Sequence, residues 1–126
     1  MAVNGQAGSG PDLESFIRNW YWDETSHEFA REAGTVLLRF INHLRAAGLS
    51  DDAIQLHRDN AWLIGAFLCQ YESRSTFTPA AFLNTKLLID DFKLRMSDFK
   101  REVASYQETY QRLVRYIRAF GYGDDE

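Results

Sequence analysis

The stretch "FINHLRAAGLSDDAIQLHRDNAW" (residues 40–62) decides the fold, because it contains the end of one helix and the start of the next. Gly48 follows a series of apolar residues, and glycine ends helices well because it takes the left-handed conformation without strain. Ser50 is a preferred N-cap. Asp51 and Asp52 would then occupy the first turn of the second helix, where the helix dipole favours anions. The stretch therefore predicts two helices joined by a tight turn.

Apolar residues recur at intervals of three and four on both sides of this turn, the spacing of amphipathic helices. The helix before the turn, from about Ser26, carries Phe29, Ala33, Val36, Leu37, Phe40, Ile41 and Leu44 on one side. The helix after it carries Ile54, His57, Ala61, Ile64, Leu68 and Tyr71, and Leu63 and Phe67 widen its apolar stripe.

The remaining segments predict further helices. Pro11 and Asp12 can open a first helix, with Leu13, Phe16, Ile17 and Trp20 on one side. Thr78 and Pro79 suit the start of a short helix, and a less regular apolar run covers residues 87–99. A last helix carries Tyr106, Tyr110, Leu113, Val114, Ile117 and Phe120 and stops at Gly121.

We therefore predict an all-α fold: a compact bundle of about five helices, six with the short one, joined by short loops. The single domain would cover residues 11–121, between a flexible leader at 1–10 and an acidic tail at 122–126. The longest apolar run, residues 61–69, is much shorter than the roughly 20 residues of a membrane span. No secretory signal pattern opens the sequence, so we expect a cytoplasmic protein.

The sequence contains no motif that indicates catalysis or a cofactor. A Glu-x-x-His motif occurs once, at Glu24 and His27, whereas a di-iron bundle needs it twice. No serine lies in a nucleophile elbow, and no glycine-rich phosphate loop is present. Cys69 has no second cysteine to pair with and is predicted to be a buried, inert thiol, and His57 a hydrogen-bonded interior histidine. We expect no enzymatic activity, metal, cofactor or small-molecule substrate.

Charge is distributed unevenly along the chain. The net charge is −4, but residues 1–73 carry 5 basic and 10 acidic side chains, whereas residues 74–120 carry 9 basic and 5 acidic. This asymmetry and the 14% aromatic content favour a surface for binding other molecules. The candidate nucleic-acid or partner-binding residues are Lys93, Arg95, Lys100, Arg101, Arg112, Arg115 and Arg118. The candidate interface residues are Trp20, Tyr21 and Trp22.

The segment "FINHLRAAGLSDDAIQLHRDNAWLIGAFL" resembles the first helical hairpin of the core-binding, SAM-like domain of tyrosine recombinases (phage integrases). The matching residues are Leu44, Gly48, Leu49, Ser50 and Ile54, and Tyr116, Ile117 and Gly121 fit the pattern of that domain's final helix. The usual Thr and Tyr of the family are Ala53 and His57 here, and its Asp-Leu pair is Asn60-Ala61. The family's catalytic Arg, His-x-x-Arg and Tyr have no counterpart, so the resemblance implies a helical scaffold with a DNA-facing surface but no strand cleavage.

Two interpretations of function follow. The first is a non-catalytic protein that binds a protein partner or self-associates, and we favour it because the net charge is negative. The alternative is a stand-alone DNA-binding or recombination-accessory module that uses the basic residues of the C-terminal half. DNA binding would weaken steeply with salt, whereas an apolar interface would tolerate it.

Overall fold

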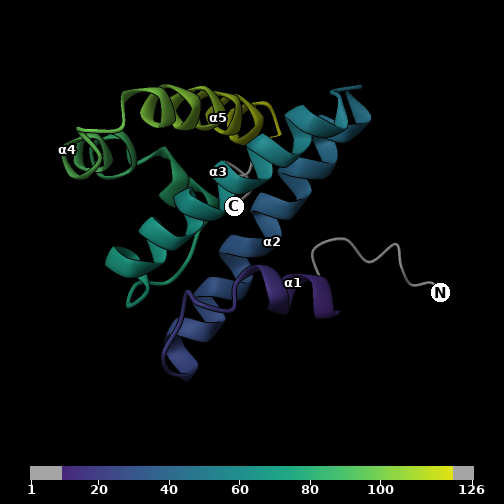
Figure 1. Ribbon diagram of the computed structural model, residues 1–126. Helices are drawn as coiled ribbons and strands as arrows, with labels where there is room; N and C mark the ends of the chain where they lie inside the picture. The colour runs from purple at the N-terminus through teal and green to yellow at the C-terminus, as the bar shows by residue number, and fades with distance from the viewer. Residues whose placement is uncertain (1–9, 121–126) are drawn as a thin grey trace.

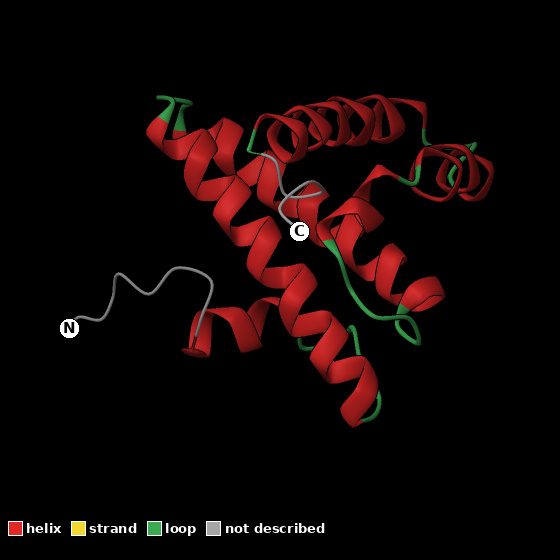
Figure 2. Ribbon diagram, turned by 180° about the vertical axis from the view of Figure 1, so that it is seen from behind, coloured by secondary structure: helices red, strands yellow, loops and turns green. Residues whose placement is uncertain are grey.

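The computed structural model describes residues 10–120, and it confirms the predicted all-α fold. The α-helices are α1 (Gly10–Phe16), α2 (Glu24–Ala46), α3 (Asp51–Glu72), α4 (Phe92–Arg95) and α5 (Lys100–Ala119), as shown in Figure 1. A 3-10 helix, η1 (Pro79–Leu83), and a π-helical segment, η2 (Lys86–Asp91), precede α4. No strand occurs among residues 10–120, and the view in Figure 2 shows helices joined by short loops.

The long helices α2 and α3 form the predicted hairpin. Gly48 has a φ of 94° and ends the first helix. The side chain of Ser50 accepts a hydrogen bond from the backbone N–H of Ala53 at 3.2 Å, which caps α3. The turn is therefore explained by local capping alone.

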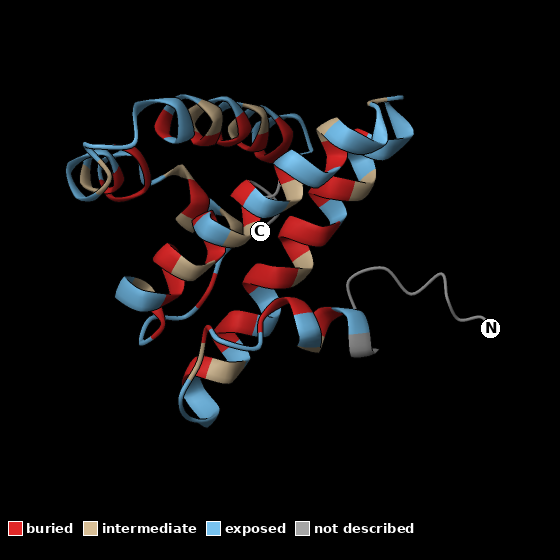
Figure 3. Ribbon diagram, in the orientation of Figure 1, coloured by how far each residue is buried: buried red, intermediate tan, exposed pale blue. Residues whose placement is uncertain are grey.

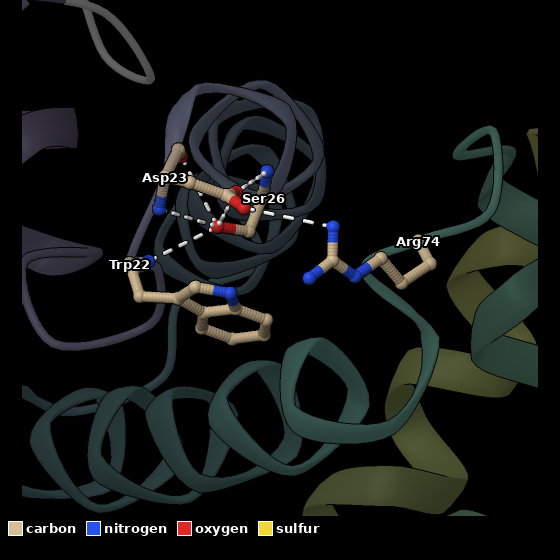
Figure 4. A network of polar contacts seen from close by, with 4 residues as sticks. All are labelled: Trp22, Asp23, Ser26 and Arg74. Atoms are coloured by element: carbon tan, nitrogen blue, oxygen red, sulfur yellow. Dashed lines mark hydrogen bonds and ion pairs between the residues drawn. The ribbon is translucent and has the colours of Figure 1, made fainter.

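The start of α2 differs slightly from the prediction. The helix begins at Glu24, two residues before Ser26, because Asp23 is its N-cap. Ser26 and Asp23 form a reciprocal capping box, with Asp23 Oδ1 accepting from the Ser26 N–H at 2.9 Å (Figure 4). These hydrogen bonds lower the pKa of the Asp23 carboxyl.

The core lies where α1, α2, α3 and α5 face one another, and Figure 3 shows the buried residues on these inner sides. Helix α5 packs on α3 and η1, and α1 packs on α2. The indole of Trp20 fills a slot between α2 and α3. A Cβ added to Gly65 would lie 2.1 Å from Trp20 Cη2, so the slot exists because this position has no side chain.

Three residues predicted on apolar stripes lie at the surface instead. Leu63 and Tyr71 on α3 and Phe120 after α5 are exposed, because neighbouring elements cover these positions only in part or not at all. The irregular run at 87–99 is explained by η2, whose wider turn shifts the apolar spacing before α4 begins. The predicted leader, apart from Gly10, the stop at Gly121 and the tail at 122–126 lie outside the described residues.

Candidate interaction surface

The seven predicted basic residues do not form one strip. The first group lies on α4 and in the first turn of α5 and consists of Lys93, Arg95, Lys100 and Arg101. The second group lies in the last turns of α5 and consists of Arg112, Arg115 and Arg118. Arg112 lies eleven positions after Arg101, a distance of about 16 Å along the helix axis. The structure thus divides the predicted site into two groups.

The first group lies at an exposed corner and is partly engaged. The guanidinium of Arg95 donates a hydrogen bond to the hydroxyl of Tyr71 and lies 5.7 Å from the centre of the Phe67 ring. Lys93, Lys100 and Arg101 are exposed. This group therefore resembles an ordinary solvated surface next to an Arg–aromatic contact.

The second group borders a hollow. The last turns of α2 and α5 border a depression of about 380 Å³ that is open to solvent, which we call the basic aromatic hollow. Its lining residues are His43, Leu44, Arg112, Arg115, Tyr116, Ala119 and Phe120. The hollow thus combines residues more than 60 positions apart in the sequence.

Three rings form one side of the basic aromatic hollow. The ring centres of His43 and Tyr116 are 5.1 Å apart, those of His43 and Phe120 are 5.2 Å apart, and those of Tyr116 and Phe120 are 4.9 Å apart. Tyr116 is buried at 8% exposure, and the ring of Phe40 lies 5.6 Å behind it. Phe120 is 54% exposed, so its ring faces solvent while it packs on the rings of His43 and Tyr116.

The charge at the hollow is positive. Arg112 forms an ion pair with Glu108 at 3.6 Å, and its Nε is buried without a hydrogen-bond partner among residues 10–120. Arg115, one turn away, is exposed and makes no ion pair with any residue that the structure describes. The exposed ring is therefore bordered by two guanidinium groups, of which only that of Arg112 has a carboxylate partner in the described part of the chain. This arrangement suits a carboxylate joined to an apolar group.

The predicted Trp-rich interface is only partly at the surface. Trp20 is 3% exposed, so the prediction that it lies at an interface is wrong: its indole is needed in the slot between α2 and α3. Tyr21 is half-buried and stacks on His27 with the ring centres 4.0 Å apart. Trp22 is 57% exposed, and the guanidinium of Arg74 lies 5.9 Å from its ring centre (Figure 4).

His57 is a buried, hydrogen-bonded histidine, as predicted. Its Nδ1 lies 2.7 Å from Thr109 Oγ1, which also accepts a hydrogen bond from Asn60 Nδ2 at 3.0 Å. Burial, and then the nearby Arg112 charge, lower the pKa of His57. No sequence pattern indicates Thr109 as the partner of His57, because the pairing joins α3 to α5 across 52 residues. This network fixes the contact between the two helices.

The histidine of the Glu24-x-x-His27 motif has a different partner. His27 Nε2 pairs with Glu14 Oε1 at 3.0 Å, and Arg31 lies 3.4 Å from the other oxygen of Glu14. Within residues 10–120, no three potential ligand side chains come close enough to hold a metal ion. Cys69 is buried as predicted, and burial raises the pKa of its thiol to about 12. No helix in this part of the chain is both long and apolar enough to cross a membrane.

Comparison with known proteins adds no assignment. No family model matches the sequence, and neither a characterised protein nor a solved structure is similar enough to count as a match. The resemblance to recombinase core-binding domains remains a prediction.

Proposed function

We propose that the chain is a non-catalytic interaction protein, which binds an acidic, aromatic-bearing protein segment in the basic aromatic hollow. One observation carries the proposal: the exposed ring of Phe120 borders the same hollow as the guanidinium of Arg115, which makes no ion pair with any residue among 10–120. An apolar ring in a hollow supplies binding energy when it is desolvated, and an arginine beside it supplies specificity for a carboxylate.

The charge balance favours an acidic protein segment over DNA. The chain carries a net charge of −4, and long-range repulsion from phosphates would oppose DNA binding outside the basic groups. The charge of Arg112 is partly balanced by its ion pair with Glu108. The positive charge that remains at the hollow suits one or two carboxylates rather than a row of phosphates.

DNA binding is the second candidate function. Its support is the solvent side of α5, where Lys100, Arg101, Arg115 and Arg118 are all exposed. A DNA duplex would contact both basic groups at once, because its line of phosphates is long enough to follow α5 from one end to the other. The two candidates therefore differ in which arginines and lysines they require.

Fluorescence anisotropy distinguishes the candidates. The probes are a labelled peptide in which glutamates flank a single tryptophan, and a labelled DNA duplex, each at low and moderate salt. We expect the peptide to bind and Arg115→Glu to weaken its binding about tenfold or more. Lys100→Glu is the matched control, because it makes the same charge change on the same helix but outside the hollow.

Either of two results would overturn the proposal. One is the absence of peptide binding at low salt. The other is equal weakening by Arg115→Glu and Lys100→Glu, which would indicate a diffuse electrostatic attraction. Duplex binding that both variants weaken, with a steep dependence on salt, would establish the DNA-binding alternative instead.

A further inference from the structure

The end of the molecule remote from the hollow carries the complementary chemistry. Trp22 is an exposed aromatic residue followed directly by Asp23 and Glu24, and this "WDE" segment lies at the start of α2. The basic aromatic hollow lies beside the last turns of the same helix, which has 23 residues. Figure 1 shows these two ends of α2 at opposite ends of the molecule. A helix of 23 residues is about 34 Å long.

We propose that the "WDE" segment of one copy binds in the basic aromatic hollow of a second copy. This inference rests on the proposed function and names the acidic, aromatic-bearing segment as the chain's own. The indole of Trp22 would pack against Phe120, and the carboxylate of Glu24 would face Arg115. Glu24 is exposed and makes no ion pair with any residue among those described, so it is available for this contact.

The segment is held in place before it binds. The backbone N–H of Trp22 donates to Ser26 Oγ at 3.0 Å, and the N–H of Asp23 donates to the same oxygen at 3.0 Å (Figure 4). Arg74 lies 3.6 Å from Asp23 Oδ2 and covers part of the indole, so the loop after α3 also fixes this region. A preorganised segment loses little conformational entropy on binding, which favours association.

The geometry of such a contact determines the kind of assembly. The two surfaces differ from each other and lie at opposite ends of one chain, so the interface is heterologous. Each copy then offers one "WDE" segment and one hollow, and successive copies add head to tail. The contact includes an ion pair at its exposed rim, so association should weaken as salt is added.

Two variants that each remove one half of the contact test this inference. Trp22→Ala removes the aromatic part of the segment, and Arg115→Glu places a carboxylate at the hollow. Both side chains are exposed, so the fold should persist, and circular dichroism checks that it does. Phe99→Ala is the matched control, because this ring is also exposed, at 51%, but belongs to the N-cap residue of α5, at the opposite end of that helix from the hollow.

The measurement is sedimentation velocity over a range of concentrations. We expect the average mass of the wild-type chain and of Phe99→Ala to rise with concentration. Each of the two variants should associate about tenfold more weakly when alone. Mixed in equal amounts, they should form a dimer and nothing larger, because Trp22→Ala keeps an intact hollow and Arg115→Glu keeps an intact segment.

Three results would overturn the inference: a wild-type chain that stays monomeric, single variants that associate like wild type, or a mixture that forms no dimer. The outcome also separates this inference from the proposed function. A monomeric chain that binds the glutamate–tryptophan peptide in its hollow retains the proposed function and refutes self-association. A monomeric chain that binds no peptide refutes both.

Discussion

Two tyrosines one turn apart on α5 should respond in opposite ways to the loss of their hydroxyl groups. Tyr106 is fully buried at 0% exposure, and its hydroxyl has no hydrogen-bond partner among the described residues. Its ring stacks on Phe92 with centres 3.6 Å apart and planes inclined by 6°. Tyr110 is also buried, but its hydroxyl donates to the backbone carbonyl of Phe82 at 2.7 Å. Burial raises the pKa of both phenols, so both are neutral at physiological pH.

The expected magnitudes follow from these environments. Tyr106→Phe keeps the stacked ring and removes an unpartnered hydroxyl, whose burial costs about 1–3 kcal/mol. We expect this variant to be about 1 kcal/mol more stable than wild type, since part of that cost is recovered by local relaxation. Tyr110→Phe removes a buried hydrogen bond and leaves the Phe82 carbonyl unpaired, so it should lose about 1–2 kcal/mol.

Urea unfolding followed by circular dichroism measures both effects. The slope of the free energy of unfolding against urea should be unchanged, so that the shift in midpoint reports stability alone. Tyr110→Phe is the control for the removal of a phenolic oxygen from the same helix. A Tyr106→Phe variant that is about 1 kcal/mol less stable than wild type would refute the reasoning, because it would show that the hydroxyl is hydrogen-bonded.

Three further predictions concern packing, protonation and thiol reactivity. Gly65→Ala should destabilise the fold by about 2–3 kcal/mol and shift the tryptophan emission, because the new methyl group overlaps the Trp20 indole. Unchanged emission and stability would show that the indole does not pack against Gly65. The lowered pKa of His57 means that the unfolded chain binds more protons, so stability should fall as the pH decreases through and below 6.5. His57→Asn should make the thermal unfolding temperature depend less steeply on pH between 5 and 7.5. An unchanged pH dependence would show that other groups cause it. Cys69 should react with a disulfide reagent at neutral pH only as fast as the protein opens, and rapid labelling of the native protein would show that the thiol is accessible.

The sequence predicts the α2–α3 hairpin well because its determinants are local. Gly48 and Ser50 each act through the backbone of their own turn, so the turn can be predicted without knowledge of tertiary contacts. The apolar spacing likewise places most of the core. It overstates burial at Tyr71 and Phe120, since spacing shows which side of a helix is apolar but not whether another element covers it.

The features that define the candidate site are not local. The sequence places Trp20 both on the apolar side of the first helix and among the interface candidates, and the packing at Gly65 decides that it belongs to the core. The basic aromatic hollow pairs His43 with Phe120, residues whose proximity depends on how α5 crosses the end of α2. In the sequence, Phe120 is only one member of the apolar side of the last helix, and a histidine in the last turn of a helix is sufficiently explained by the helix dipole.

The helix dipole also limits what charge alone can indicate about this protein. Glu24 in the first turn of α2 and Arg45 in its last turn each stabilise the helix, so they would occupy these places even if neither end bound anything. Opposite charges at the two ends of α2 are therefore a consequence of folding as much as a sign of function. The rings of Trp22 and Phe120 have no such explanation. They face solvent at 57% and 54% exposure, as the ring of Phe99 does at 51%, although most other rings among residues 10–120 are buried. Because a large apolar ring in solvent adds little to folding stability, we propose the interaction surfaces at these two rings and use the charges beside them to pair the surfaces.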